Sequence, residues 1–276
     1  MKNILYTVAI IITILWTAAC NLEKTVDLNL PEFESQLVVE CYLEVGKPYR
    51  VLLTESVSYF GTALAANLPA VSGATVIITY NGVSDTLTEA PFLDLDNQKI
   101  FNYGSSTIVP ENYDNEFSLE VIDTSGRSLI ATTKLLQSIP LDSIQTIQLE
   151  DTSVTILTIH TDIPNEDNFY YRTLHRTKPI SDSMKIAFVI DDAFINSPAT
   201  NQLVIGSPPF FKAGDTAVVT LYHVTKGFAD YLETTSSSEQ NNGNPFGTPG
   251  TIKSNVEGGF GVFTGLSYVR DTFYLD

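Results

Sequence analysis

Short runs of β-forming residues, separated by turn residues, fill most of the chain. The first two runs, 37–43 and 49–54, lie on either side of Gly46, which predicts two strands around a turn. Asn81 and Gly82 stand between two further runs, and this dipeptide favours the positive φ angles that a type I′ hairpin turn requires. About six to eight such strands precede residue 138, a number and spacing typical of an immunoglobulin-like sandwich.

A proline at position 140 interrupts this rhythm where the first set of hairpins is complete, and strand-like runs resume after it. We therefore predict a mainly β protein with two β-sandwich (immunoglobulin-like) domains. The N-terminal sandwich is expected over 34–138, and a C-terminal β-rich domain over 139–276.

One short helix is predicted near Phe228 to Thr235, because Phe228, Tyr231 and Leu232 have the i, i+3, i+4 spacing of a helical face. The segment from Ser236 to Gly250 is rich in Ser, Asn, Gly and Pro. Such a composition favours a long surface loop.

A different pattern opens the chain: Lys2 is followed by an apolar run that ends at Trp16, and small residues then lead to Cys20. A membrane-spanning helix needs about 20 apolar residues, so the run is short for that role. The pattern predicts a signal peptide over 1–19, cleavage before Cys20 and acylation of its thiol. Residues 20–33 would then form a lipid-anchored tether. Thr17 stands where leucine is usual, which leaves a plain secreted protein or a retained anchor as alternatives.

The net charge and the number of cysteines limit the partners and bonds that can be expected. The formal net charge of −17 disfavours nucleic acid and anionic headgroups, so membrane attachment is expected to come from the lipid on Cys20. Cys20 and Cys41 are the two cysteines in the sequence. If Cys20 carries lipid, no intramolecular disulfide can form, and Cys41, in an apolar strand pattern, is expected to be a small buried hydrophobe.

Two stretches carry a family resemblance: residues 31–40 with their continuation to 52–56, and 244–247 with 254–263. Both are similar to segments of a family of outer-membrane lipoproteins of Bacteroidota, catalogued as domain of unknown function four-two-four-nine. Cys41 departs from that pattern, because glycine is expected there. The resemblance implies an outer-membrane lipoprotein commonly encoded near TonB-dependent transporters. It brings no agreed activity and no catalytic residues.

The candidate chemical groups have simpler interpretations. Each histidine lies in a strand-like segment without a second ligand at zinc spacing, the acidic loop at 94–98 lacks the glycine and distal glutamate of a calcium loop, and neighbouring acids on a strand point to opposite faces. These groups are His160, His175, His223, Asp94, Asp96, Asn97, Glu166, Asp167, Asp191 and Asp192. We predict no catalytic residue, no metal site and no cofactor, and we expect the glycines at 258–261 to mark close strand packing or a bulge.

Aromatic residues in loops remain as contact candidates: Phe210, Phe211 and Phe246. They either bind a partner or anchor their own loops. The leading hypothesis is a non-enzymatic accessory lipoprotein that docks on a TonB-dependent outer-membrane transporter or captures its ligand. An envelope hydrolase of glycan or peptide, and a structural or adhesion module of the cell surface, are the alternatives.

Overall fold

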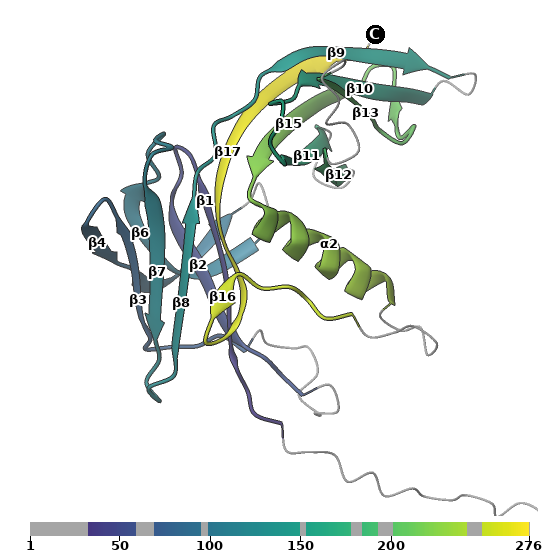
Figure 1. Cartoon of the computed structure of the whole chain (residues 1–276). Helices are drawn as coiled ribbons and strands as arrows, with labels where there is room; N and C mark the ends of the chain where they lie inside the picture. Colours follow the sequence, from purple (N-terminus) through teal and green to yellow (C-terminus); the bar gives the residue numbers. More distant parts are fainter. Residues whose placement is uncertain are drawn as a thin grey trace, which may run out of the picture. The chain divides into compact units, whose positions relative to one another are not determined.

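The computed structural model describes residues 33–58, 69–94, 99–149, 153–177, 184–192, 201–241 and 250–275. The chain divides into two units, Met1–Glu34 and Ser35–Asp276, and every strand named below belongs to the second (Figure 1). The predicted fold class is confirmed, because the structure is mainly β with several sheets. Cys20 and the predicted signal peptide lie outside the described residues, so the lipid anchor stays a prediction.

The largest sheet has eight strands in the order β12-β11-β15-β17-β1-β2-β6-β5. Their bounds are β1 Leu37–Glu44, β2 Pro48–Glu55, β5 Thr88–Asp94, β6 Lys99–Ile108, β11 Phe169–Arg176, β12 Met184–Asp191, β15 Thr216–Val224 and β17 Phe260–Tyr274. The long strand β17, yellow in Figure 1, pairs in parallel with β1 and antiparallel with β15. It therefore joins strands from both halves of the chain.

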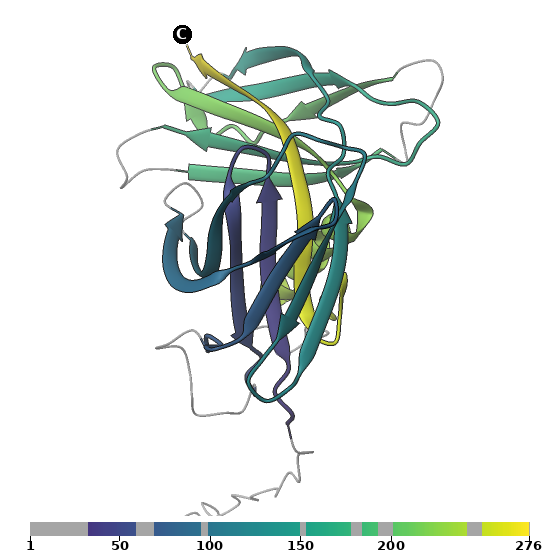
Figure 2. The same ribbon diagram turned by 90° about the vertical axis from the view of Figure 1, so that its left-hand side faces the viewer.

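A second sheet of five strands, in the order β16-β8-β7-β3-β4, packs against part of the first and faces the viewer in Figure 2. Its strands are β3 Thr75–Tyr80, β4 Val83–Thr86, β7 Glu116–Ile122, β8 Ser128–Lys134 and β16 Val256–Glu257. Fully buried aliphatic side chains such as Val39, Leu53 and Ile78 fill the space between the two sheets. The two sheets form a β-sandwich, to which β16 and β17 from the end of the chain also contribute.

The predicted Asn-Gly hairpin is confirmed. Asn81 and Gly82 have φ angles of 49° and 75°, and Tyr80 pairs directly with Val83 across the turn. Both residues adopt the left-handed backbone conformation. A two-residue hairpin turn requires this conformation if it is to match the twist of the strands.

The remaining strands, β9 Leu141–Gln148, β10 Ser153–Thr161, β13 Gln202–Gly206 and β14 Phe211–Lys212, form a four-stranded sheet around β10. Its inner side chains, among them Val154 and Ile156, pack with Leu174 and Val219 of the large sheet. This contact gives the second half of the chain a core of its own.

The predicted division at 138/139 differs from the structure. The large sheet runs without a break from β5 to β12, and Ser35–Asp276 is one unit. The reason is that β17, at the end of the chain, returns to pair with β1. Such a long-range pairing has no local signal in the sequence. The hydrophobic cores agree better with the predicted division than the sheets do. Among the described residues, the sandwich core consists of residues from 37–135, and only Val256 and Phe263 come from the later part of the chain.

The helix α2, Lys226–Asn241, is longer than predicted and includes residues 236–241, which we expected in a loop. Its buried residues Phe228 and Ala229 pack beside Tyr222 and Val262 of the large sheet. Tertiary packing of this kind outweighs the weak helix propensity of the serines that follow.

Glycine in the 258–261 segment marks close packing, as predicted. Gly261 has a φ of +119°, and a Cβ atom there would lie 1.9 Å from the carbonyl oxygen of Val39. Since Gly261 is paired with Val39 in the parallel β1–β17 ladder, this close approach allows the last strand to join the sheet.

Candidate functional site

The large sheet has a second face, which begins with the alternation of β1. Val39, Cys41 and Leu43 point into the sandwich core, so the residues between them, including Tyr42, face the other way. On that other face, α2 covers part of the sheet. A groove of about 480 Å³ lies there, within the range of about 300–1,000 Å³ that is common for small-molecule sites.

Both halves of the chain contribute to this groove. Its lining comes from strands β1, β2, β5, β6, β11, β15 and β17, from the β1–β2 turn and from α2. The lining residues are Tyr42, Glu44, Lys47, Pro48, Arg50, Leu93, Asp94, Lys99, Phe101, Tyr171, Tyr222, Phe228, Leu232 and Leu266. We call this site the groove.

Aromatic rings form one part of the groove. The ring centroids of Tyr171 and Tyr222 are 5.6 Å apart, and Phe228 meets Tyr171 and Tyr42 edge to face at 5.9 and 6.0 Å. Burial raises the pKa of Tyr171, and burial followed by the charge of Glu44 raises that of Tyr222. The phenol hydroxyls therefore stay protonated at physiological pH. They can form hydrogen bonds, but they do not act as bases.

Charged side chains form the other part. Glu44 is buried, with Lys47 3.1 Å from one carboxylate oxygen and Arg270 3.7 Å from the other. Lys99 donates to Glu40 and to the Tyr42 hydroxyl, the latter at 3.2 Å, and its ammonium lies 4.7 Å from the centroid of the Tyr42 ring. The charges are held in fixed positions by these contacts.

Arg50 is anchored differently. It donates to the backbone carbonyls of Tyr49 and Ser105 at 2.8 and 2.7 Å, and its guanidinium lies 4.0 Å from the centroid of the Phe92 ring. Gly104 leaves room for it, because a Cβ there would be 2.6 Å from Nη1 of Arg50. Burial lowers the pKa of Arg50, and no carboxylate in the described ranges forms an ion pair with it.

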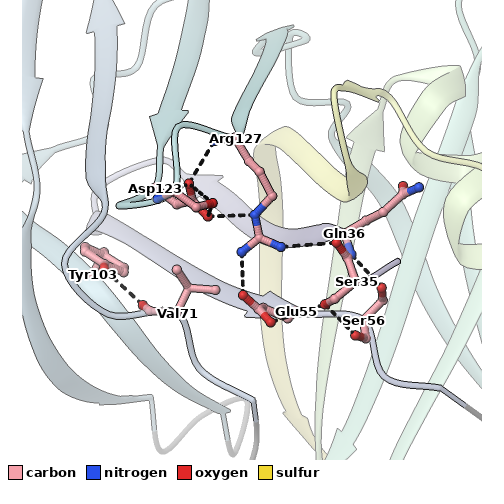
Figure 3. A network of polar contacts seen from close by, with 9 residues as sticks. Ser35, Gln36, Glu55, Ser56, Val71, Tyr103, Asp123 and Arg127 are labelled. Carbon is pink, nitrogen blue, oxygen red and sulfur yellow. Dashed lines mark hydrogen bonds and ion pairs between the residues drawn. The ribbon is translucent and has the colours of Figure 1, made fainter. Parts of the chain in front are cut away.

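A second hollow, of about 450 Å³, lies at the loop end of the sandwich and holds the network drawn in Figure 3. Arg127 donates through Nε to Asp123 at 2.7 Å and through Nη1 to the Ser35 carbonyl at 3.1 Å, and it pairs with Glu55. Ser35 in turn donates to the Ser56 carbonyl at 2.8 Å. Since these groups satisfy one another, the network is structural and fixes the segment where the sheet begins.

The predicted contact residues differ in their exposure to solvent. Phe210 is 51% exposed, whereas Phe211 is fully buried in the core beneath the four-stranded sheet. Phe211 lies on the short strand β14 and is a core residue, the alternative interpretation, and its side chain cannot meet a partner at the surface. Phe246 lies outside the described residues.

The structure also shows where acidic and histidine candidates lie. Asp191 is exposed and Asp192 is buried beside Asn168, so the neighbouring acids do face opposite ways. His160 and His223 are buried, and Asp94 lies in the groove, while Asp96 and Asn97 are outside the described ranges. Within those ranges, no three His, Cys, Asp or Glu side chains are grouped so that they could hold a metal ion.

Sequence reasoning missed the groove itself. One local signal was present, because Glu40, Tyr42 and Glu44 alternate with apolar residues in an otherwise buried strand. A strand with one aliphatic and one polar-aromatic face indicates two different environments. The other walls of the groove come from residues 47–101 and 171–266, which are brought together by the sheet order alone.

The comparisons with known proteins give a family but no activity. The profile of the family called Domain of unknown function (DUF4249) matches residues 23–272. The chain belongs to the DUF4249 family. The match spans the groove, the sandwich and the four-stranded sheet, so the residues described above are parts of one family domain. No curated protein matches the chain.

Two solved structures are similar at a distance. A chain of a cytokine receptor complex (crystal form 2) is 11% identical, with 67% of this chain and 90% of that chain covered and a TM-score of 0.25. The FN1–FN3 domains of chicken CNTN1 are 8% identical, with 86% and 66% covered and a TM-score of 0.27. Likenesses at these TM-scores support no inference about function. The helix that the structure describes is neither long nor apolar enough to cross a membrane.

Proposed function

We propose that this DUF4249 protein is a non-enzymatic, lipid-anchored binding protein of the cell envelope, which acts as an accessory or ligand-capture partner of a TonB-dependent outer-membrane transporter. The groove is the observation that carries the proposal. It combines a volume of about 480 Å³ with aromatic walls and five charged side chains, a combination typical of binding sites for small molecules.

The state of its polar groups favours binding over catalysis. Glu44 pairs with Lys47 and Lys99 pairs with Glu40, so these contacts fix the positions of the charges that a ligand meets. The phenols of the groove are kept neutral by burial. Catalysis by a nucleophile would instead need a side chain activated by a neighbouring base.

The location in the envelope is supported by the sequence. A short apolar run leads to Cys20 after small residues, the pattern of a signal whose terminal cysteine is acylated. Two or more acyl chains give a stable anchor to a membrane. The family resemblance implies proteins that are commonly encoded near TonB-dependent outer-membrane transporters, and such a transporter would receive the captured ligand.

The test is affinity purification of the tagged protein from envelopes after mild crosslinking. A TonB-dependent transporter should copurify with the wild type, and the mature N-terminus should be an acylated Cys20 by mass. Cys20→Ser should release the protein into the soluble fraction. An unmodified N-terminus at another residue, or the absence of any transporter from the crosslinked material, would contradict the proposal.

An adhesion module is the second candidate, because apolar side chains are exposed on and beside the four-stranded sheet. Val204 is 57% and Phe210 is 51% exposed, and such groups can take part in contact with another macromolecule. Binding of the purified protein to intact cells, abolished by Phe210→Ser and unaffected by changes in the groove, would favour this function over ligand capture.

A further inference from the structure

The two ends of the groove differ in polarity, and the order of the strands shows it. The end formed by β11, β15, β17 and α2 carries no charged lining residue: it consists of Tyr171, Tyr222, Phe228, Leu232 and Leu266. All five charged lining residues lie from β1 to β5: Glu44, Lys47, Arg50, Asp94 and Lys99. A ligand that fills the groove therefore meets mainly rings and leucines at one end and charged lining residues at the other, and the two regions meet where Tyr222 lies near Glu44 and Arg270.

The groove as a whole has a positive surplus. Its lining includes three cations and two carboxylates. Adding Glu40, which pairs with Lys99, and Arg270 of β17, which pairs with Glu44, gives four cations and three carboxylates. The chain as a whole carries a formal charge of −17. An anion is thus favoured in the groove compared with the rest of the surface.

Arg50 is the group best placed to receive that anion. Its guanidinium is held in place by two carbonyls and the Phe92 ring, and no carboxylate in the described parts of the chain is paired with it. Burial lowers its pKa, which means that its charge is partly removed from water without a counter-charge. A bound carboxylate would supply one, through a charge-assisted hydrogen bond.

The distance between the ends sets the shape of the ligand. Tyr222 lies on β15 and Arg50 on β2, three strand positions apart in the sheet. With about 4.8 Å between neighbouring strands, the spacing across the sheet alone separates the two residues by about 14 Å. A ligand that touches both ends is therefore elongated and crosses several strands.

Two other elongated ligands fit less well. A peptide laid across the strands would find side chains only, because the backbone groups within the sheet pair with neighbouring strands, and its own amides would stay unsatisfied. A neutral oligosaccharide would leave Arg50 without an anion. An acid with an apolar body has no amides to satisfy and supplies an anion to Arg50.

We propose, on the basis of the proposed ligand-capture function, that the groove binds an acidic amphiphile. Its carboxylate lies at Arg50 and Lys99, and its acyl chain runs under α2 along Tyr222 and Leu232. The ligand class is thus an aliphatic carboxylic acid of medium chain length.

The direct test is calorimetric titration of the full chain carrying Cys20→Ser, which removes the predicted acyl chains and the need for detergent. The probes are decanoate, decanol, butyrate and maltotriose. We expect decanoate to bind at least tenfold more tightly than decanol, which lacks the acid, and than butyrate, which lacks the long chain. Equal affinity for decanoate and decanol, or binding of maltotriose without binding of decanoate, would overturn the assignment.

Variants then locate the site. Arg50→Gln and Lys99→Gln should each weaken decanoate binding at least tenfold and leave decanol binding nearly unchanged, and Leu232→Trp, which fills the apolar end, should weaken both. Lys134→Gln, an exposed cation on β8 in the other sheet, is the matched control and should change neither. Decanoate affinity that survives both cation variants would also refute the site.

The test of the ligand class and the test of the proposed function can fail independently. A protein that copurifies with a transporter but binds maltotriose keeps the capture function and loses the acidic amphiphile. A protein that binds decanoate in the groove without any transporter partner keeps the ligand class and loses the accessory role.

Discussion

The two faces of the large sheet are built from neighbouring residues of the same strands, yet they differ in almost every property. On β1, Val39 and Cys41 face the sandwich core and are fully buried among aliphatic side chains. Their neighbours Glu40 and Tyr42 face the groove and form a hydrogen-bonded pair at 2.8 Å. One face is buried and mainly aliphatic, and the other combines rings with ions.

Because of this difference, the sandwich face stabilises the fold and the groove face is suited to binding. Burial raises the pKa of the Cys41 thiol far above its usual range, so this cysteine is inert and acts as a small hydrophobe, as predicted. Ions could not replace such residues without a large desolvation cost. On the groove face, the ions lie near each other, and Lys99 and Glu40 are partly exposed. Substitutions on the sandwich face should therefore unfold the protein, and those on the groove face should alter binding.

The largest effect is expected at Gly261. A Cβ atom there would lie 1.9 Å from the Val39 carbonyl oxygen, at a φ of +119°, so Gly261→Val should separate β17 from β1. Because domains are stable by only about 5–15 kcal/mol, the variant should fail to fold. The measurement is thermal unfolding by circular dichroism. Gly46→Ala, where φ is +80° but no atom lies within 4 Å, is the control and should cost about 1 kcal/mol.

A pair of leucines compares the two faces directly. Leu53 is fully buried in the sandwich and Leu93, in the groove, is 64% exposed. Leu53→Ala should lower the free energy of unfolding by about 2–5 kcal/mol, since it leaves a cavity in a packed core, while Leu93→Ala should change it by less than about 0.5 kcal/mol. Denaturant titration of both variants measures this, and similar losses would show that the two faces contribute alike.

Acid should weaken the loop end of the sandwich face by a smaller amount. Burial alone would raise the pKa of Asp123, but hydrogen bonds from Arg127 and Ser125 outweigh it and lower the pKa from 3.8 to about 2. A lowered pKa in the folded state gives stability that is present above pH 3.8 and is lost as the pH falls through about 2. We expect a loss of about 1–2 kcal/mol over this interval, reduced from the full shift because Arg127 is partly exposed.

The matched variant for this titration is Asp123→Asn, which keeps the size of the side chain and removes the charge. Its stability at neutral pH should be lower than that of the wild type, and the difference should shrink toward pH 2. A difference that stays constant with pH would mean that the Asp123 charge does not stabilise the fold.

Local patterns predicted the sandwich face but not the groove. Alternation around Val39 and the Asn81-Gly82 turn are encoded within a few residues, so the strands and the hairpin followed from them. The pairing of β1 with β17 joins residues more than two hundred positions apart, and no local pattern indicates it. The groove depends on that pairing, because it brings Tyr222 into the same lining as Tyr42 and Arg50. The same pairing explains why the predicted boundary at 138 does not divide the large sheet.

The smallest effect is expected at Lys99, on the groove face. Its side chain is 38% exposed and pairs with Glu40, which is 25% exposed, and ion pairs of this kind contribute about 0–1 kcal/mol. Lys99→Met keeps the apolar stem that lies beside the Tyr42 ring and removes the ammonium. The free energy of unfolding should therefore fall by less than about 1 kcal/mol in a denaturant titration. A loss as large as that of Leu53→Ala would show that the ions of the groove hold the fold together, and the separation of stability from recognition between the two faces would not stand.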